Sequence, residues 1–394
     1  MPILINSVEV ALITTIPWIV TPLIATLRMA RSTFLDDESP EPPIAPPHVS
    51  VIVPARNESR NIAACLRSIL ASEYPNFEVV IVNDHSSDDT REIARGIAGE
   101  DRRLVVLDSP ELPPGWFGKQ WACQTGASAT TGTILIFMDA DARASTDLIV
   151  RSVNGMLRTD ADFYSVLGKQ EMITFWERLI QMQIFTVLLT RFGGTEIVNR
   201  AKSASAKIAN GQYLMVHRSV YDEFGGHGLV RGYVAEDLML AQRYFELGRK
   251  TVLVSGMSQL STRMYTSLRE LIGGWRKNLF AGGRHSMPHG ARLAALAPLL
   301  LPLPFLMQLV PAILLVVALV LHLHALLVWS AVSVCATVLS WLMYYRMAQV
   351  FVGYALLYPL GAAVALYIAV SAIIRGSRVE WKGREYESLN PAST

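Results

Sequence analysis

The sequence predicts an α/β protein with a doubly wound sheet and transmembrane helices near both ends of the chain. Between residues 49 and 138, short apolar runs of strand length alternate with amphipathic runs of helical length, which is typical of a parallel sheet covered by helices. Hydrophobic residues make up 51% of the 394 residues, and their excess is concentrated at 8–27 and 293–374. We therefore expect one globular domain between two membrane-associated regions.

Charge and cysteine content exclude some classes of protein. The formal net charge is only +2, which gives no reason to expect a nucleic-acid partner. The three cysteines, Cys65, Cys123 and Cys335, are far apart and lack the spacing of metal ligands or disulfides. They are typical of small apolar side chains in a reducing compartment.

The N-terminal apolar run, residues 8–27, is about long enough to cross a bilayer, although prolines interrupt it. No small-residue cleavage site follows it, and Arg28 and Arg31 come directly after it. This pattern predicts a retained anchor over residues 1–31 with the next domain on the cytoplasmic side. Residues 32–48 are acidic and rich in proline, so we expect an extended linker there.

The globular domain is expected over residues 49–290. Its predicted strands lie at 49–53, 78–82, 104–107 and 134–138, and a helix is predicted from about Lys119. Ligands of doubly wound sheets bind beyond the carboxyl ends of the strands. The polar residues that follow three of these strands therefore mark a candidate site, and they are Arg56 to Glu58, Asp84, and the pair Asp139 and Asp141.

Asp139 and Asp141 end the most apolar of these strands. In extended backbone, residues two apart point to the same side, so the two carboxylates could converge on one point. A hard divalent cation such as Mg2+ or Mn2+ would relieve their repulsion and take its other ligands from water and a diphosphate. The alternative is a pair of exposed aspartates in a turn.

Two later segments are too polar to span a bilayer and too apolar for a free surface. Residues 172–192 predict a helix in the membrane interface, with a buried core helix as the alternative. Residues 268–280, where Trp275 is flanked by Arg276 and Lys277, predict a second interface helix.

From residue 291 to 375 the chain is lipid-like. We divide this region into 293–321, which its prolines could break into two elements, 325–345 and 354–374. A basic tail follows at 376–394. Three crossings from a cytoplasmic domain would leave this tail outside, against the positive-inside tendency. An even number of crossings or a re-entrant segment would remove the conflict.

Five short motifs follow one another along the chain. They are Pro54-Ala55-Arg56-Asn57-Glu58, Asn83 to Asp88, Gly118-Lys119, Asp139-Ala140-Asp141 and Glu236-Asp237. In this order they resemble a family 2 glycosyltransferase with the nucleotide-sugar-binding fold of GT-A type. Residues 112–122 and the tail from Trp381 to Tyr386 resemble its membrane-bound branch. That branch includes hopene-associated glycosyltransferases and the chlorobactene and diaponeurosporenoate glucosyltransferases, whose acceptors are polyisoprenoid lipids.

The resemblance implies roles for most of these residues. Asp237, with Glu236, would supply the general base that an acceptor hydroxyl requires. Asp139 and Asp141 would hold the metal. The nucleotide sugar would be bound by Pro54, Arg56, Glu58, Asp84, Lys119 and Asp139.

Each of these roles has a simpler structural alternative. Asp84 and Asp88 could act only in turns and helix caps. Acidic residues are also favoured in the first turn of a helix, as Glu236 and Asp237 would be. His227 could be a further ligand, although a loop histidine is the simpler interpretation.

One difference from the processive members of this family concerns the product. Processive synthases carry a Gln-x-x-Arg-Trp motif, and here Trp275 is present while the Gln and Arg are absent. The departure favours transfer of a single sugar. Trp275 and Arg276 are then candidate acceptor contacts, with an interfacial anchor as the alternative for the tryptophan.

We therefore expect a multi-pass enzyme of the cell inner membrane. It would transfer one sugar, with inversion, from a nucleotide sugar of the UDP-glucose type to a hydroxyl of a polyisoprenoid or other lipid. The alternatives are a processive polysaccharide synthase and a polyprenyl-phosphate sugar transferase. From another class, a transporter or a noncatalytic scaffold remains open.

Overall fold

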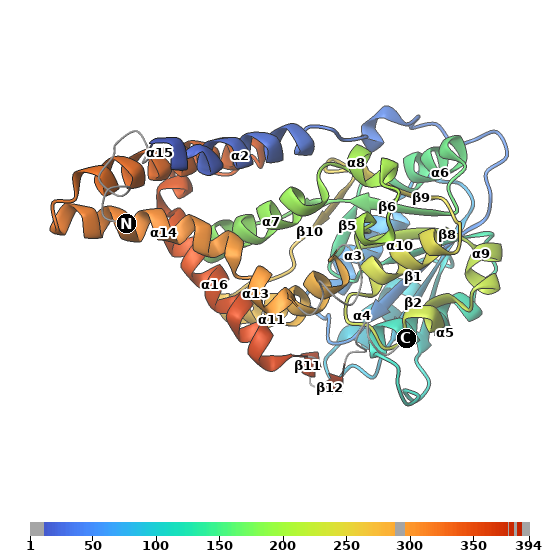
Figure 1. Cartoon of the computed structure of the whole chain (residues 1–394). Coiled ribbons are helices and arrows are strands. Elements are labelled where there is room, and N and C mark those ends of the chain that lie inside the picture. Colours follow the sequence, from blue (N-terminus) through green and yellow to red (C-terminus); the bar gives the residue numbers. More distant parts are fainter. Residues whose placement is uncertain (1–11, 288–295, 377, 382–383, 388–394) are drawn as a thin grey trace.

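The computed structural model of the chain describes residues 12–287, 296–376, 378–381 and 384–387. An α/β domain occupies one side of the molecule, and long helices project from it on the other (Figure 1). Two further helical segments lie between these parts (Figure 1). The arrangement places the carboxyl ends of the central strands toward the helical part.

The domain is built on a seven-stranded mixed sheet with the order β3-β2-β1-β4-β8-β6-β9. The first four strands are parallel, and β8 runs antiparallel between β4 and β6. The predicted strands are all present, within two residues at each end, and the α/β prediction is confirmed. The strands are β1 (Val49–Ala55), β2 (Phe77–Asn83), β3 (Leu104–Asp108), β4 (Ile134–Met138), β6 (Phe163–Leu167), β8 (Tyr213–His217) and β9 (Thr251–Ser255).

Helices cover both faces of this sheet and form a core on each. On one face α3 (Ile62–Leu70), α4 (Thr90–Ala98) and α6 (Leu148–Thr159) bury their apolar sides. On the other face α5 (Gly118–Ser128) and α10 (Glu236–Glu246) do the same. Strand β4 is buried at every residue because both of its faces are covered.

Short elements complete the domain around this core. A small sheet has the order β5-β10-β7. Its strands are β5 (Ala142–Ala144), β7 (Lys169–Gln170) and β10 (Leu260–Thr262), and the short helices are η1 (Leu35–Asp37), α8 (Thr195–Arg200), η3 (Ala204–Ala206), α9 (Arg218–Glu223) and η4 (Gly226–Val230).

The Pro-rich linker lies against α6. Leu35 is fully buried, and the guanidinium of Arg158 donates from Nε to Glu38 Oε2 at 2.9 Å. Asn154 Nδ2 donates to the backbone oxygens of Ser39 and Glu41 at 2.9 and 2.8 Å. These bonds hold the linker to the domain along its length.

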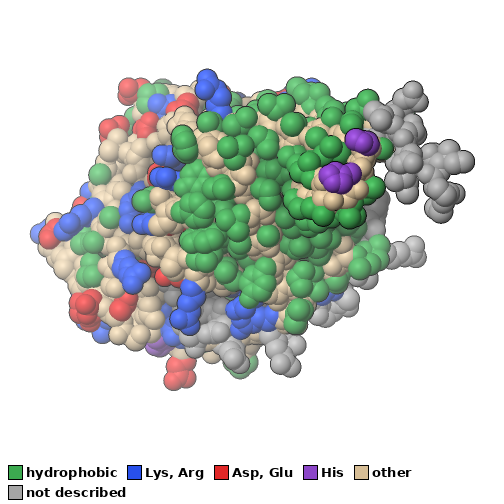
Figure 2. Space-filling view, turned by 90° about the vertical axis from the view of Figure 1, so that its left-hand side faces the viewer, with side chains coloured by type: hydrophobic (Ala, Val, Ile, Leu, Met, Phe, Trp, Pro, Cys, Tyr) green, Lys and Arg blue, Asp and Glu red, His purple; other side chains and the backbone are tan. Residues whose placement is uncertain are grey.

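Four helices in the described part of the chain are long and apolar enough to cross a membrane. They cover Leu12–Met29, Ala297–Val320, His324–Met347 and Val352–Arg375. The helices themselves are α2 (Ile16–Met29), α13 (Ala297–Leu300), α14 (Leu303–Val320), α15 (His324–Met347), η5 (Val352–Leu357) and α16 (Tyr358–Arg375). Hydrophobic side chains dominate the surface of this end of the molecule (Figure 2).

The apolar segments agree with the prediction at most boundaries. The first predicted segment began at residue 8, and residues 8–11 lie outside the described chain. Residues 293–295 of the second predicted segment also lie outside the described chain. Its described part is divided into α13 and α14, since Pro302 and Pro304 fall at the junction and lack the N–H that an uninterrupted helix needs.

The two predicted interface helices lie between the domain and the apolar helices (Figure 1). Residues 172–192 form a π-helical turn, η2 (Glu177–Gln181), followed by α7 (Met182–Phe192). Residues 268–280 belong to a longer helix, α11 (Leu268–His285). Side chains of η2, α7, α11 and α16 share one apolar cluster, so these elements connect the domain to the membrane-compatible helices.

The basic tail returns to the domain. After α16 it forms a hairpin of β11 (Arg378–Trp381) and β12 (Arg384–Glu387). Arg384 Nη1 donates to both carboxylate oxygens of Asp84, at 3.0 and 2.8 Å. A tail that contacts the domain lies on the same side of any bilayer as the domain.

We predict opposite stability effects for two glycine-to-alanine changes. A Cβ at residue 132 would lie 2.5 Å from Ser50 N and 2.9 Å from His48 O, so Gly132→Ala should cost about 1–3 kcal/mol of unfolding free energy. A Cβ at residue 96, within α4, meets nothing within 4 Å, so Gly96→Ala should add about 0.5–1 kcal/mol. Thermal unfolding in detergent measures both. Equal melting temperatures for the two variants would contradict the packing at the start of β4.

Candidate active site

The candidate site lies in a single cavity of about 2780 Å3 that reaches from the carboxyl ends of β1, β2 and β4 to the apolar helices. Its polar end contains Glu58, Asp84 and Asp141. Its far end contains Trp18, Gln308 and Trp341, from α2, α14 and α15. A polar site and a membrane-compatible wall therefore belong to one continuous space.

Lys119 is the centre of the polar end. Its Nζ lies 2.7 Å from Asp139 Oδ1 and 2.7 Å from Glu236 Oε1. Burial lowers the pKa of Lys119, but the two carboxylates outweigh this effect and hold the pKa well above its usual value. Lys119 stands at the start of α5, where the helix dipole disfavours a cation. The two carboxylates explain why a cation is stable there.

Asp139 and Asp141 both line the cavity, but not by the predicted geometry. Strand β4 ends at Met138, and Ala142 N donates to Asp139 O at 3.1 Å, which closes a turn. The expectation that an extended backbone aligns the two carboxylates is therefore wrong, because residues 140 and 141 form the turn. Burial raises the pKa of Asp139 more than Lys119 lowers it.

The donor set around these aspartates fits a cation that keeps some non-protein ligands. Among the described residues, no group of three or more His, Cys, Asp or Glu side chains could hold a metal ion. Two carboxylates alone suit Mg2+ or Mn2+, which commonly take the remaining positions from water and phosphate oxygens.

Asp237 sits in the first turn of α10 and is fixed by two backbone donors. Gly211 N donates to Oδ2 at 2.9 Å, and Leu238 N donates to Oδ1 at 2.7 Å. Burial and the neighbouring Glu236 raise the pKa of Asp237 to about 6. For Glu236 itself, burial acts to raise the pKa, but Lys119 outweighs it and the pKa is lowered. At neutral pH both carboxylates are therefore largely ionised.

The ends of β1 and β2 bring together the residues predicted to bind the nucleotide. Pro54, Arg56, Glu58 and Asp84 all line the cavity. Arg56 Nη1 donates to the backbone oxygen of Asp84 at 2.7 Å and holds the loop after β2. The loop and these side chains form one wall of the polar end.

Two residues have structural roles. Asp88 accepts from Thr90 Oγ1 at 2.5 Å and from Ser59 N and Thr90 N at 3.1 Å each, and these bonds lower its pKa to about 2 against the effect of burial. His227 is buried, its Nδ1 lies 2.8 Å from Tyr221 Oη, and burial lowers its pKa to about 3. Asp88 is thus engaged in turn hydrogen bonds, and His227 is a core residue rather than a cavity ligand.

Trp275 and Arg276 both line the cavity from α11. Trp275 is only 6% exposed and packs edge-on against Phe185 and Tyr265, with ring centroids 5.5 and 6.2 Å away. Its Nε1 is buried and has no hydrogen-bond partner among the described residues. Trp275 therefore belongs mainly to an aromatic wall, with one polar atom left to bond a ligand.

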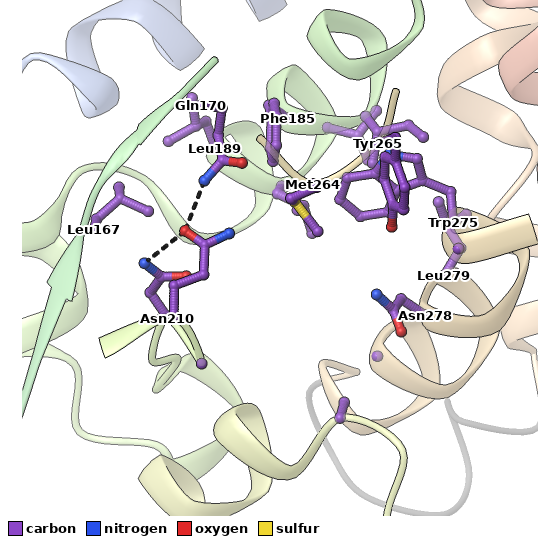
Figure 3. A pocket seen from close by; sticks show the side chains of 18 of the residues that line it. Leu167, Gln170, Phe185, Leu189, Asn210, Met264, Tyr265, Trp275, Asn278 and Leu279 are labelled. Atoms are coloured by element: carbon purple, nitrogen blue, oxygen red, sulfur yellow. Dashed lines mark hydrogen bonds between the residues drawn. The ribbon is translucent and has the colours of Figure 1, made fainter. Parts of the chain in front are cut away.

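The opposite wall was not anticipated from the sequence. Figure 3 shows Gln170 and Asn210 facing Tyr265 and Trp275 across the cavity. Both amides donate to Gln212 Oε1, at 2.9 and 3.3 Å. Three amide side chains opposite aromatic rings can bond hydroxyl groups on one side and stack on the other.

Three further residues were not assigned to the site from the sequence, namely Lys277, Gly211 and Arg384. No local pattern marks them as site residues. Lys277 lines the cavity next to Arg276, and burial lowers its pKa although Glu236 opposes this effect. A Cβ at Gly211 would lie 3.0 Å from Asp237 Oδ2, so a side chain there would press on the carboxylate. Arg384 reaches Asp84 from the tail, where only the resemblance of that tail to the membrane-bound branch gave a signal.

One protein family matches the part of the chain that contains most of the sheet. Residues 50–225 match the model of the family described as Glycosyl transferase family 2. This part of the chain is therefore a glycosyltransferase family 2 domain, as the sequence motifs predicted.

Named relatives agree with this assignment. The chain is 27% identical over 244 residues to 4,4'-diaponeurosporenoate glycosyltransferase of Staphylococcus haemolyticus, and 26% identical to the same-named protein of Staphylococcus aureus. Each match covers 61% of this chain and 63% of the relative, so the chain spans less than two thirds of their length.

A solved structure supports the fold along nearly the whole chain. A mannosyltransferase from Pyrobaculum calidifontis, solved with GDP-Man and Mn2+, aligns with a TM-score of 0.53 and 19% identity. The alignment covers 94% of this chain and 98% of that one. At this identity the likeness establishes a shared GT-A-like fold.

We predict that Lys119→Met destabilises the protein in a pH-dependent way. It leaves Asp139 and Glu236 without their shared cation, at a cost of about 3 kcal/mol at pH 8. Both folded-state pKa values should then rise above their unfolded values, so the folded state binds protons and regains stability as the pH falls toward 5. Melting temperatures at pH 8 and pH 5 measure this effect.

The control is Lys202→Met, which removes an exposed lysine. It should shift the melting temperature little at either pH. A Lys119→Met variant as stable as the wild type at pH 8 would contradict the bridging role.

Proposed function

We propose that the protein transfers a single sugar, with inversion, from a nucleotide sugar of the UDP-glucose type to a hydroxyl of a polyisoprenoid or other lipid. One observation carries the proposal: the cavity that holds Asp139, Glu236 and Asp237 continues to helices apolar enough to lie in a bilayer. A soluble acceptor would need no such wall. A lipid could place its head at the carboxylates while its chain stays in apolar surroundings.

The names of the relatives support the class of acceptor. The staphylococcal proteins are named as glycosyltransferases of 4,4'-diaponeurosporenoate. The mannosyltransferase of similar fold was solved with a nucleotide sugar and Mn2+. Both facts favour a nucleotide-sugar donor and a lipid acceptor here, without fixing the base or the sugar.

In this proposal the donor lies along the ends of β1, β2 and β4. Pro54, Arg56, Glu58 and Asp84 would contact the base and ribose, where carboxylates accept hydrogen bonds from N–H and hydroxyl donors. Lys119 would direct the diphosphate toward the metal side of the site. Its cation already neutralises two carboxylates there, which lowers the repulsion that an anionic donor would meet.

Asp139 and Asp141 would hold Mg2+ or Mn2+. A divalent cation at this place offsets the charge that grows on a departing diphosphate. Among the described residues these two carboxylates would provide the protein's share of its ligands.

Asp237 would act as the general base. Its two backbone hydrogen bonds fix the carboxylate in place, and a pKa of about 6 leaves it ionised at pH 7 yet basic enough to take a hydroxyl proton. The acceptor then attacks from the face opposite the diphosphate, which inverts the anomeric centre. Trp275 and Arg276 would contact the acceptor, and the amides of Gln170, Asn210 and Gln212 would bond sugar hydroxyls.

The expected organisation follows from the same proposal. Residues 1–31 would anchor the chain, residues 49–290 would form the catalytic domain on the cytoplasmic side, and residues 291–375 would enter the inner membrane. The tail at 376–394 would stay on the side of the catalytic domain. Asp237 argues against a polyprenyl-phosphate acceptor, because an ionised phosphate needs no base.

We predict that purified protein in detergent adds one hexose to a lipid when given UDP-glucose, Mn2+ and a total lipid extract, as detected by mass spectrometry. Asp237→Asn should lower the rate by about 10²–10⁴-fold, since the amide cannot accept the proton. Asp222→Asn, which alters an aspartate outside the cavity, serves as the control and should keep the activity. Lipids that gain several hexoses would favour a polymer synthase instead, and nucleotide binding without any glycosylated product would favour the scaffold.

We also predict an acid limb in the pH profile of kcat/KM. Because Asp237 must be ionised and its pKa is about 6, activity should fall below pH 6, by about tenfold per pH unit. Glu236→Gln removes the negative neighbour that raises this pKa, so the limb should move to lower pH. Glu246→Gln changes an exposed glutamate on the same helix and should leave the limb in place. An unmoved limb in Glu236→Gln would assign the titration to another group.

A further inference from the structure

The C-terminal hairpin makes contacts that the proposed mechanism does not use. Residues 84 and 384 are 300 positions apart, yet Arg384 Nη1 lies 3.0 and 2.8 Å from the two oxygens of the Asp84 carboxylate. The Asp84 side chain is 3% exposed, while that of Arg384 is 23% exposed. A nearly buried carboxylate is therefore paired with a cation that comes from the far end of the chain.

A second contact lies beside the first. The ring of Tyr386 stacks on Phe117 with centroids 4.2 Å apart and an interplanar angle of 16°. Gly118 N donates to Tyr386 Oη at 3.4 Å. Phe117 and Gly118 directly precede Lys119, so the hairpin packs against the residues that position the cation shared by Asp139 and Glu236.

Gly118 fits this arrangement closely. A Cβ at this position would collide with Asp84 Oδ2 and lie 2.8 Å from Arg384 Nη1. The absence of a side chain at residue 118 therefore makes room for the ion pair. Strand β2, helix α5 and the hairpin meet at this point.

The hairpin lies behind the wall of the cavity and does not fill it. Asp84, Phe117 and Lys119 line the cavity. Arg384 and Tyr386, whose side chains the structure describes, are not among its lining residues. Both contacts to Asp84 also come from a single guanidinium nitrogen and leave lone pairs of the carboxylate for another donor.

We infer that the C-terminal hairpin completes the donor site, with Arg384 as a positioning residue that fixes the Asp84 carboxylate and Tyr386 as a brace for the start of α5. The inference rests on the proposed function, because it assigns the nucleotide to the Asp84 wall. It goes beyond that function by making nucleotide binding depend on the chain that follows α16. Helix α16 and the proposed donor site are thereby connected through one short hairpin.

The experiment measures nucleotide binding directly, with the full-length protein in detergent. UDP and GDP, each with Mn2+, are titrated calorimetrically into wild type, Arg384→Ala and Arg384→Lys. Loss of a charge-assisted bond to the base-binding carboxylate should weaken binding of the preferred nucleotide about 10-fold or more in Arg384→Ala. The lysine variant should recover part of the loss, since it keeps the charge on a shorter side chain.

Two comparisons separate positioning from general destabilisation. Arg158→Ala removes an arginine from another nearly buried carboxylate, that of Glu38, which is 4% exposed and remote from the cavity. It should lower the melting temperature without weakening nucleotide binding. In an Asp84→Asn background, Arg384→Ala should cause little further loss, because the two side chains act through one contact.

In the transfer assay, Arg384→Ala should raise the KM for the nucleotide sugar and leave the KM for the lipid near the wild-type value. Unchanged nucleotide affinity in Arg384→Ala would overturn the inference. Tighter binding would also overturn it, because the hairpin would then be an obstacle to the donor. If wild type bound neither nucleotide, the proposed function itself would fail, which is a distinct outcome.

Discussion

The site depends on one buried ionic bridge, in which Lys119 lies 2.7 Å from both Asp139 and Glu236. It joins three elements that the sheet brings together: the start of α5, the end of β4 and the start of α10. Without the cation, the carboxylates of Asp139, Glu236 and Asp237 would repel one another in a desolvated space. The same bridge separates their protonation behaviour, lowering the pKa of Glu236 while Asp237 stays near 6. Lys119 thus allows the three carboxylates to lie close together in the polar end of the cavity.

The second constraint is the connection between the domain and the apolar helices. Trp275 and Leu271 on α11, Ile184 on α7 and Ile368 on α16 belong to one apolar cluster. Ile184 and Trp275 of this cluster line the cavity. Because these side chains are packed rather than loose, the position of α16 is fixed relative to the active site. This rigidity suits the proposed reaction, in which the head group of a lipid must reach a defined point.

The family match and the contacts in the structure support different parts of the candidate site. The family match covers residues 50–225, which contain Asp139, Asp141 and the strands of the main sheet except β9 and the first residue of β1. It does not reach Asp237, the helices α11 to α16 or the hairpin. For those parts the argument rests on contacts in the structure: the bonds from Gly211 and Leu238 to Asp237, and the pairing of Arg384 with Asp84.

The first four strands, the apolar segments and most residues of the polar site could be predicted from the amino-acid sequence. Such features depend on local signals: apolar runs, breaking residues and acidic residues directly after a strand. A turn at Asp139 to Ala142 was only the alternative interpretation, because a two-residue spacing fits both extended and turned backbone. Only the tertiary structure decided which distant residues meet: Lys119 with Glu236, Gln170 with Gln212, and Arg384 with Asp84. These pairings depend on how helices and strands pack, and no local pattern in a single sequence records that.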